Sequence, residues 1–231
     1  MIILGIESAT ENASCALLSD TKLLGEYSLN TGKTHSENLM NIIDKLIVET
    51  EVELRDISGI AITKGPGSYT GLRIGISIAK SMSQTLKIPI LSVSTLESLA
   101  YNLPCSENII NPILDARSNR IYTGIYRLTN NKIEESEKDS ATNIEEHINF
   151  LKKQDYDKKI IFIGDGAVKH KELLKTEFKD KCTIAENYIN IIKASSSAQA
   201  GLIKFKNKDL CSWRDFNPVY LRKTQAERNK K

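Results

Sequence analysis

The sequence predicts an α/β protein built from two similar lobes. Apolar runs typical of buried strands alternate with segments of helical periodicity, and the order of these elements starts again after the first hundred or so residues. The chain of 231 residues is 40% hydrophobic, which suits one large domain or two small ones. We expect a first lobe over residues 1–104 and a second over residues 105–231, with the C-terminal segment as a candidate to pack back on the first lobe.

The first lobe is predicted to open on three strands. Residues 2–7 are almost all apolar, as in a strand that is buried on both faces. Residues 14–18 and 22–29 follow at short spacing, with Ser19 and Asp20 as the turn between them. These three strands are expected to form an antiparallel meander.

Two long helices are predicted next. Thr34 and Glu37 have the spacing of a capping box, and apolar residues then recur at helical period. They are Leu39, Ile42, Ile43, Leu46 and Ile47. A strand at 57–63, a helix at 70–86, a strand at 89–93 and a short helix at 95–102 are expected to complete the lobe.

The second lobe repeats the alternation. Strands are predicted at 109–116, 120–128 and 159–163, the first two as a hairpin, and helices at 144–152, 168–178 and 194–204.

Composition excludes several classes of protein. No window approaches the roughly 18 unbroken apolar residues of a membrane helix, and the start of the chain lacks the pattern of an export signal. Four widely spaced cysteines, without a Cys-x-x-Cys pair, indicate reduced thiols. We therefore expect a cytoplasmic protein without membrane contact.

A net charge of +3 is too small to predict nucleic-acid binding by itself. Basic residues gather near the C-terminus, at Arg222, Lys223, Arg228, Lys230 and Lys231. Such an end is usually a solvated tail, and direct contact with RNA is the second interpretation.

A glycine-rich turn is the most informative motif. Gly65 and Gly67 permit unusual backbone angles or close backbone approach, and Ser68 or Thr70 can cap the helix that follows. Such a turn can aim backbone N–H groups at an anion, or can simply connect a strand to a helix. It is not a Walker-type loop, because the Gly-Lys-Ser/Thr ending is missing.

Small residues recur every four positions in the predicted second helix, at Gly71, Gly75 and Ala79. Such a ridge allows another backbone to approach closely. Packing on the protein's own sheet and docking of a partner helix explain it equally well.

The hairpin at residues 5–12 is where actin-like kinases hold a phosphate. Glu7 supplies an acidic residue, but no glycine follows Gly5, and Glu11 would repel a triphosphate. Either the phosphate chemistry is eroded or this is an ordinary polar hairpin.

Asp115 and Arg117 lie at the end of a predicted strand. They are either part of a polar site or a local ion pair that contributes little energy.

Together these segments resemble the TsaB (YeaZ) family of tRNA threonylcarbamoyladenosine biosynthesis proteins. The central motif is residues 65–75, and the match outside it covers nearly the whole chain except residues 129–157. The matching segments are Ile6-Glu7-Ser8, residues 16–18, His35-Ser36 with Leu39, residues 112–117 with Tyr122, residues 164–167 and residues 218–222. This chain has Glu7 where the family usually has Asp, and Tyr69 where the family often has Phe.

The resemblance implies a two-lobed actin-like fold, shared with sugar kinases and related to ribonuclease H. It also implies a non-catalytic subunit that binds and activates the catalytic paralogue TsaD, joined by the ATPase TsaE. The complex would transfer a threonylcarbamoyl group to the adenosine next to the anticodon. No cofactor of its own is expected, because ATP and metal would belong to the partner subunits. A homodimer is expected when the chain is alone, and contact with tRNA is expected through the complex.

On this interpretation, helices of the first lobe would form the partner interface. The candidates are His35, Leu39, Ile43, Ile47, Gly71, Ile74, Gly75, Ile78 and Met82. Candidates for an anion-proximal, nucleotide-proximal or complex-forming site are Glu7, Ser8, Gly65, Gly67, Ser68, Thr70, Arg73, Asp115 and Arg117. The sequence does not fix which face of each helix is turned towards its own sheet.

Two alternatives come from other classes. An active small-molecule kinase would need glycine in the phosphate hairpin, which residues 8–12 do not supply. A metallopeptidase, a label that related chains have carried, would need a metal site. The three histidines, His35, His147 and His170, include no pair at the i, i+4 spacing of a metal-binding helix.

Overall fold

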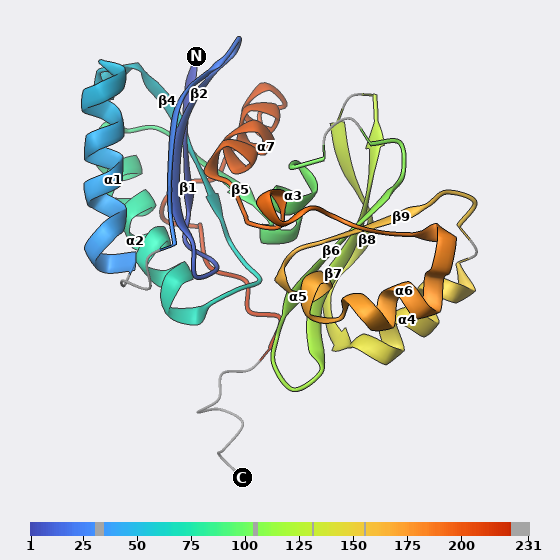
Figure 1. Cartoon of the computed structure of the whole chain (residues 1–231). Coiled ribbons are helices and arrows are strands. Elements are labelled where there is room, and N and C mark those ends of the chain that lie inside the picture. The colour runs from blue at the N-terminus through green and yellow to red at the C-terminus, as the bar shows by residue number, and fades with distance from the viewer. Residues whose placement is uncertain (31–34, 104–105, 131, 155, 223–231) are drawn as a thin grey trace. The chain divides into compact units, whose positions relative to one another are not determined.

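The computed structural model describes residues 1–30, 35–103, 106–130, 132–154 and 156–222, with the backbone alone at residues 35–37. The chain divides into two compact units (Figure 1). The first unit comprises residues 1–98 and 192–220, and the second begins at Leu99, runs to Ile191 and takes up the chain again at Leu221. The segment 192–220 therefore belongs to the same unit as the N-terminal strands.

The first unit contains a five-stranded mixed sheet in the order β3-β2-β1-β4-β5. The first three strands pair antiparallel, and the last two run parallel to β1. The elements are β1 (Ile2–Glu7), β2 (Ala13–Ser19), β3 (Leu23–Leu29), α1 (His35–Thr50), β4 (Ile57–Thr63), α2 (Tyr69–Leu86), β5 (Ile90–Val93) and α7 (Ala194–Lys206), and α3 (Thr95–Ala100) spans the boundary between the units. The predicted meander and both long helices are confirmed.

Helices cover both faces of this sheet. Helices α1 and α2 pack on one face, and α7 packs on the other (Figure 1). Side chains of β1 alternate between the two faces, because successive residues of a strand point in opposite directions. Leu4 and Ile6 join the cluster under α1 and α2, whereas Gly5 faces α7, where a Cβ atom would meet the Ala194 carbonyl oxygen at 2.2 Å.

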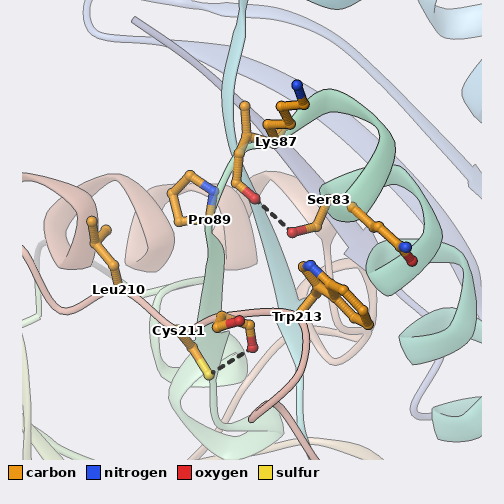
Figure 2. A pocket seen from close by; sticks show the side chains of 9 residues that line it. Ser83, Lys87, Pro89, Leu210, Cys211 and Trp213 are labelled. Atoms are coloured by element: carbon orange, nitrogen blue, oxygen red, sulfur yellow. Dashed lines mark hydrogen bonds between the residues drawn. The ribbon is translucent and has the colours of Figure 1, made fainter.

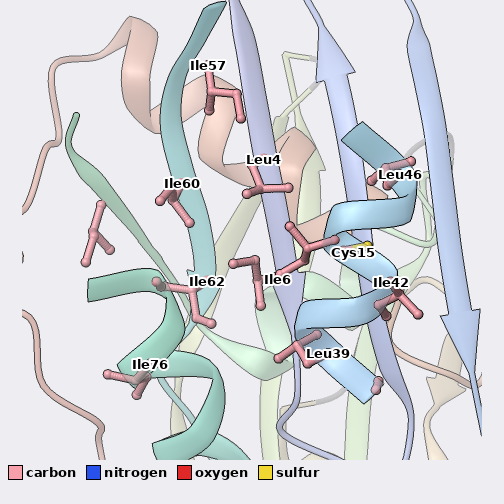
Figure 3. Packing of buried hydrophobic residues seen from close by; sticks show 14 of the residues in the cluster. Leu4, Ile6, Cys15, Leu39, Ile42, Leu46, Ile57, Ile60, Ile62 and Ile76 are labelled. Atoms are coloured by element: carbon pink, nitrogen blue, oxygen red, sulfur yellow. The ribbon is translucent and has the colours of Figure 1, made fainter. Parts of the chain in front are cut away.

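The core under α1 explains the helical periodicity of the sequence. Leu39, Ile42, Ile43 and Leu46 are at most 5% exposed, and Figure 3 shows three of them pointing towards the strands. The apolar face is confirmed, and it faces the protein's own sheet. Burying a side chain of this size stabilises the fold by about 1.5–3 kcal/mol.

The second unit repeats the strand order of the first, with β10-β9-β6-β7-β8. Here β6, β7 and β8 form the antiparallel meander, and β9 and β10 run parallel to β6. The elements are β6 (Ile109–Asp115), β7 (Arg120–Thr129), β8 (Lys132–Asn143), α4 (Ile144–Lys153), β9 (Ile160–Ile163), α5 (Asp165–Lys169), α6 (Lys171–Phe178) and β10 (Cys182–Ile184). Short 3-10 turns lie at Lys179–Lys181 and Asn187–Ile189 in this unit and at Leu54–Asp56 in the first.

Three elements of this unit differ from the sequence prediction. Strand β8 was not predicted because it is an edge strand rich in charge, in which Ile133 is the one buried residue. Charged side chains protect an exposed edge. Strand β10 has three residues, too few to show a pattern. The helix predicted at 168–178 begins earlier, at Asp165, and is divided at His170, whose backbone leaves the helical region.

In the described part of the chain no helix is long and apolar enough to cross a membrane. Cys15, Cys182 and Cys211 are free thiols, and Cys105 lies outside the described residues.

Candidate functional site

Glu7 ends β1 on the face that α7 covers, beside Thr63 at the end of β4. Its side chain is fully buried, and Oε1 accepts a hydrogen bond from the Ala9 N–H at 2.6 Å. Burial raises the pKa of Glu7 to about 7, although the Ala9 amide, Thr63 and Ser197 act to lower it. The other oxygen, Oε2, has no hydrogen-bond partner in the described part of the chain. A carboxyl in this environment is held partly protonated at neutral pH.

The glycine-rich turn packs between two backbone segments, one at Ala9 and the other at Val219. Gly65 has φ +119°, and a Cβ atom there would meet the Val219 carbonyl oxygen at 2.5 Å. A Cβ atom on Gly67 would meet the Ala9 carbonyl oxygen at 2.3 Å, and that same oxygen accepts a hydrogen bond of 2.6 Å from the Ser68 N–H. On the other side, the Val219 N–H donates to the Lys64 carbonyl at 2.7 Å. Close backbone approach therefore accounts for both glycines.

Ser68 is the cap of α2, and Thr70 lies exposed in the first turn. The Ser68 hydroxyl accepts a hydrogen bond from the Gly71 N–H at 3.2 Å, with extended backbone angles typical of an N-cap. The alternative between Ser68 and Thr70 is settled in favour of Ser68.

Replacing Ser68 by alanine is expected to destabilise the protein by about 1 kcal/mol, because a helix N–H loses its acceptor. Urea unfolding measures the change. Thr70→Ala, an exposed substitution two residues further on, should alter the free energy of unfolding by less than about 0.5 kcal/mol. Equal losses for both variants would contradict the assignment of the cap.

The small-residue ridge of α2 faces the protein's own β1–β2 hairpin. Gly71, Gly75 and Ala79 are buried, and a Cβ atom on Gly75 would lie 2.1 Å from the Ser8 hydroxyl. Of the two interpretations of this ridge, packing within the lobe is the one that the structure supports.

The predicted interface residues of the two helices lie at different depths. Leu39 and Ile43 are buried in the core under α1, so their side chains are not available as a surface. Ile47, Ile78 and Met82 pack partly buried against the same core, and Ile74 is half-buried. His35 begins α1, and its side chain lies outside what the structure describes.

Sequence reasoning missed the apolar residues that α1 does expose. Met40 is 48% exposed and Val48 is 67% exposed. Both lie outside the apolar stripe that follows the helical period. Their position off the stripe is the sequence signal that could have identified them as exposed. An apolar residue beside a complete core stripe cannot enter the same core, because the helix turns it outwards.

In the second unit, the β6–β7 turn and the segment after β9 occupy the topological positions of the β1–β2 hairpin and the glycine-rich turn. Asp165 Oδ1 accepts hydrogen bonds from the Asp115 N–H at 3.0 Å and from the Gly166 N–H at 2.7 Å. The Asp115 carboxylate pairs with the Lys169 ammonium at 2.8 Å and accepts from the Arg117 backbone N–H. The predicted Asp115–Arg117 contact therefore uses the backbone of Arg117, and the ion pair goes to Lys169.

The histidines show no sign of a metal site within the described residues. His147 is buried, its Nε2 lies 2.9 Å from Asn111 Oδ1, and burial lowers its pKa to about 4. No group of three His, Cys, Asp or Glu side chains that could hold a metal ion occurs in the part of the chain described.

A shallow pocket of about 360 Å³ lies at the C-terminal end of α2. Figure 2 shows Ser83, Pro89 and Trp213 around it, with the Ser83 hydroxyl donating to the Ile88 carbonyl. The pocket joins segments that are far apart in the sequence, so no local pattern could have predicted it.

Comparison with known proteins identifies the family. A relative in Bacillus subtilis (strain 168), the tRNA threonylcarbamoyladenosine biosynthesis protein TsaB, is 33% identical over 227 residues, covering 98% of this chain and 96% of the relative. The chain belongs to the TsaB (YeaZ) family. A sequence model described as TsaD, tRNA N6-adenosine threonylcarbamoyltransferase, also matches residues 24–230. This TsaB family member is thus involved in tRNA threonylcarbamoyladenosine biosynthesis and is related in sequence to the transferase.

Solved structures confirm the actin-like fold of this TsaB family member. A Pseudomonas aeruginosa protein with similarity to peptidase YeaZ has a TM-score of 0.81 at 21% identity, covering 96% of this chain and 99% of the other. A ROK hexokinase from Thermus thermophilus has a TM-score of 0.52 at 10% identity, covering 90% of this chain and all of the other. The fold is thus shared with sugar kinases.

Proposed function

We propose that this chain is a non-catalytic subunit that binds and activates a TsaD-like transferase, which places the threonylcarbamoyl group on the adenosine next to the anticodon. One observation carries the proposal. In each unit, a backbone N–H of the turn that follows the first parallel strand, β4 or β9, already donates to an acceptor from the chain itself.

In the first unit that acceptor is the Ala9 carbonyl, 2.6 Å from the Ser68 nitrogen. A phosphate oxygen would have to displace it, and Gly67 leaves no space for both because the hairpin lies against it. In the second unit the acceptor is the Asp165 carboxylate on the amides of Asp115 and Gly166. A fixed negative charge there opposes the approach of a phosphate.

Glu7 also differs from a carboxylate that binds a metal ion. Its side chain is fully buried at the end of β1, on the face that α7 covers. Its raised pKa leaves a large fraction of the carboxyl group uncharged at neutral pH. An uncharged carboxyl is a poor ligand for a cation that accompanies a nucleotide. We infer that ATP and metal belong to the partner subunits, among them a TsaE-like ATPase, and that this chain has no cofactor of its own.

The partner surface that we propose is the outer side of α1, including the exposed Met40 and Val48, together with the half-buried Ile74 and Ile78 of α2. These side chains lie on two helices that pack against each other (Figure 1). Exposed apolar side chains of this kind favour association with a second helix pair. Without the transferase, the same surface would pair two copies of this chain as a homodimer.

Met40→Glu and Val48→Glu are expected to weaken association with the TsaD-like partner at least ten-fold. A carboxylate buried without a partner at an interface costs more than about 1.4 kcal/mol, which corresponds to a factor of ten. Analytical ultracentrifugation of the mixed proteins measures the affinity, and transfer of the threonylcarbamoyl group to tRNA measures activity.

Leu210→Glu is the matched control. Leu210 belongs to the first unit and is 48% exposed, as Met40 is, but it lines the pocket beside the C-terminal end of α2 and does not belong to the proposed surface. It should leave association and transfer unchanged. If Leu210→Glu weakens association as much as Met40→Glu, the proposed surface is wrong. If the two wild-type proteins never associate and transfer proceeds without this chain, the proposed function is wrong.

A further inference from the structure

Three residues form an exposed cluster at the start of α2. The Arg73 guanidinium lies over the Tyr69 ring, 4.0 Å from its centroid, and Arg73 Nε donates a hydrogen bond of 3.1 Å to the Tyr220 hydroxyl. The two tyrosine rings have centroids 4.9 Å apart with their planes tilted by 34°. Tyr69 is 39% exposed and Tyr220 is 38% exposed. We call Tyr69, Arg73 and Tyr220 the Arg73 cluster.

Arg73 is held in one orientation without being neutralised. Its described contacts are with two tyrosines, and no carboxylate pairs with it in the described part of the chain. The hydrogen bond uses Nε, so the N–H groups of the two Nη atoms have no hydrogen-bond partner among the described residues. By contrast, Arg55 pairs with Glu53 at 2.7 Å. The Arg73 cluster therefore offers an oriented, uncompensated cation beside two partly exposed tyrosine side chains.

The proposed function does not account for this cluster. The structure explains Gly65, Gly67, Ser68 and Gly75 by packing and capping, but the packing of the lobe requires no exposed tyrosine pair. Fixing an arginine side chain in one rotamer loses up to about 2 kcal/mol of conformational entropy. An arrangement of this kind lowers the entropy that would be lost when an anion binds to it.

We propose that the Arg73 cluster binds a single-stranded segment of RNA. A base would stack on an exposed tyrosine ring, and the Arg73 Nη groups would hold the adjacent phosphate. Aromatic rings beside an arginine form such a platform in proteins that bind single strands. Arginine also pairs with phosphate through two parallel hydrogen bonds.

The two tyrosines favour RNA over an acidic protein segment as the occupant. An acidic peptide could pair with Arg73, but it would not use the two ring faces, whereas a nucleotide uses both features. The chain after Tyr220 continues with Arg222, Lys223, Arg228, Lys230 and Lys231 against a single acid, Glu227. The choice of RNA rests on the proposed role in tRNA modification, and it identifies this chain as one that touches the substrate directly.

Tyr69→Leu and Arg73→Lys are each expected to weaken RNA binding by about ten-fold. Stacking contributes about 1–3 kcal/mol per base, and lysine keeps the charge but loses the planar fork. The probes are a fluorescein-labelled single-stranded RNA oligonucleotide, the same sequence as a duplex, and an unmodified tRNA transcript. Fluorescence anisotropy is measured with the full chain and with its complex with the TsaD-like partner. For Arg73→Gln, the slope of log affinity against log salt should fall by about one.

Two matched controls come from the same chain. Arg214→Lys alters another arginine that lies over an aromatic ring, 4.9 Å from the centroid of Trp213, and Tyr188→Leu removes a tyrosine that is 72% exposed. Both should bind the single strand as the wild type does, and the duplex should bind more weakly than the single strand.

The inference is overturned if Tyr69→Leu and Arg73→Lys bind RNA as tightly as the wild type, or if the controls lose as much affinity. It is also overturned if these variants lose association with the partner while RNA affinity is unchanged, since the cluster would then be a protein contact. If the chain associates with the TsaD-like partner but the variants do not change RNA binding, the proposed function is retained and the RNA site is rejected. If the variants weaken RNA binding but the chain does not associate with the partner, the RNA site is retained and the proposed function is rejected.

Discussion

Replacing Glu7 by glutamine is expected to stabilise the first unit by about 3 kcal/mol above pH 7, and to change its stability little below pH 5. The reason is the buried position of the carboxyl. Burial raises the pKa of Glu7 from 4.5 to about 7, so the folded state holds a proton that the unfolded state releases. A difference of this size corresponds to about 3 kcal/mol.

The sign of the pH dependence follows from proton binding. Between pH 4.5 and pH 7 the folded protein binds more protons at Glu7 than the unfolded protein does, so this residue lowers stability as the pH rises through that window. Glutamine resembles the protonated carboxyl and does not titrate. The difference between variant and wild type should therefore grow from pH 5 to pH 7 and then stay constant.

His147 acts in the opposite direction, in the other unit. Burial lowers its pKa to about 4, so the unfolded state takes up its proton first, and stability is lost as the pH falls below about 6.5. The two effects have opposite signs between about pH 4.5 and 6.5. A flat pH profile of the wild-type protein would therefore not show that both groups are unperturbed.

Trp213 provides a local measurement for the Glu7 prediction. It is the single tryptophan of the chain, and it packs against the core of the first unit. Glu7 belongs to the same unit. Its fluorescence during urea unfolding at pH 5, 6, 7 and 8 reports that unit. Glu11→Gln, at an exposed carboxyl of the same hairpin, is the control and should change stability by less than about 0.5 kcal/mol. A constant difference between Glu7→Gln and wild type at all four pH values would contradict the argument.

The fold could be predicted from the sequence because its core strands and helices are strongly patterned. The run at residues 2–7 has the length and composition of a buried strand, and the stripe from Leu39 to Ile47 has the period of a helix. The charged edge strand β8 could not be predicted in the same way, because one buried residue in twelve gives no alternation. Local patterning therefore predicts buried elements better than edge elements.

The candidate site was harder to predict, and the residues show why. Periodicity identifies the apolar face of α1, but a sheet and a partner helix require the same pattern, so Leu39 and Ile43 were assigned to an interface although they lie in the core. The glycine-rich turn has the composition of an anion site, yet its acceptor is the Ala9 carbonyl, 59 residues away from Ser68 in the chain. Long-range contacts of this kind leave no local signal.

Replacing Gly75 by alanine is expected to destabilise the first unit by about 2 kcal/mol, although alanine is the better helix former. The added Cβ atom would lie 2.1 Å from the Ser8 hydroxyl, and Ser8 is 1% exposed and cannot move aside easily. Overpacking of this kind costs about 1–3 kcal/mol or more, against about 1 kcal/mol gained in helix propensity. The steric effect should therefore exceed the gain.

Removing the opposing hydroxyl isolates this contact. Ser8→Ala by itself should be almost neutral, because the Ser8 hydroxyl is buried without a hydrogen-bond partner among the described residues. In that background the new Cβ atom on residue 75 would meet the Cβ of residue 8 at 3.1 Å and Ile62 at 3.2 Å, which small shifts can relieve. The double variant should recover at least about 2 kcal/mol, a coupling that urea unfolding of the four proteins measures.

The same contact decides how substitutions at Gly75 can be interpreted. A bulky substitution at Gly75 would be a poor test of the partner interface, because the site is buried against Ser8 and loss of association would follow from a damaged lobe. Met40 and Val48 test the interface without this ambiguity, since both are exposed. If Gly75→Ala unfolds at the same urea concentration as the wild type, and Ser8→Ala changes nothing in its presence, then the ridge of α2 does not pack as the structure has it and again becomes a candidate docking surface for a partner helix.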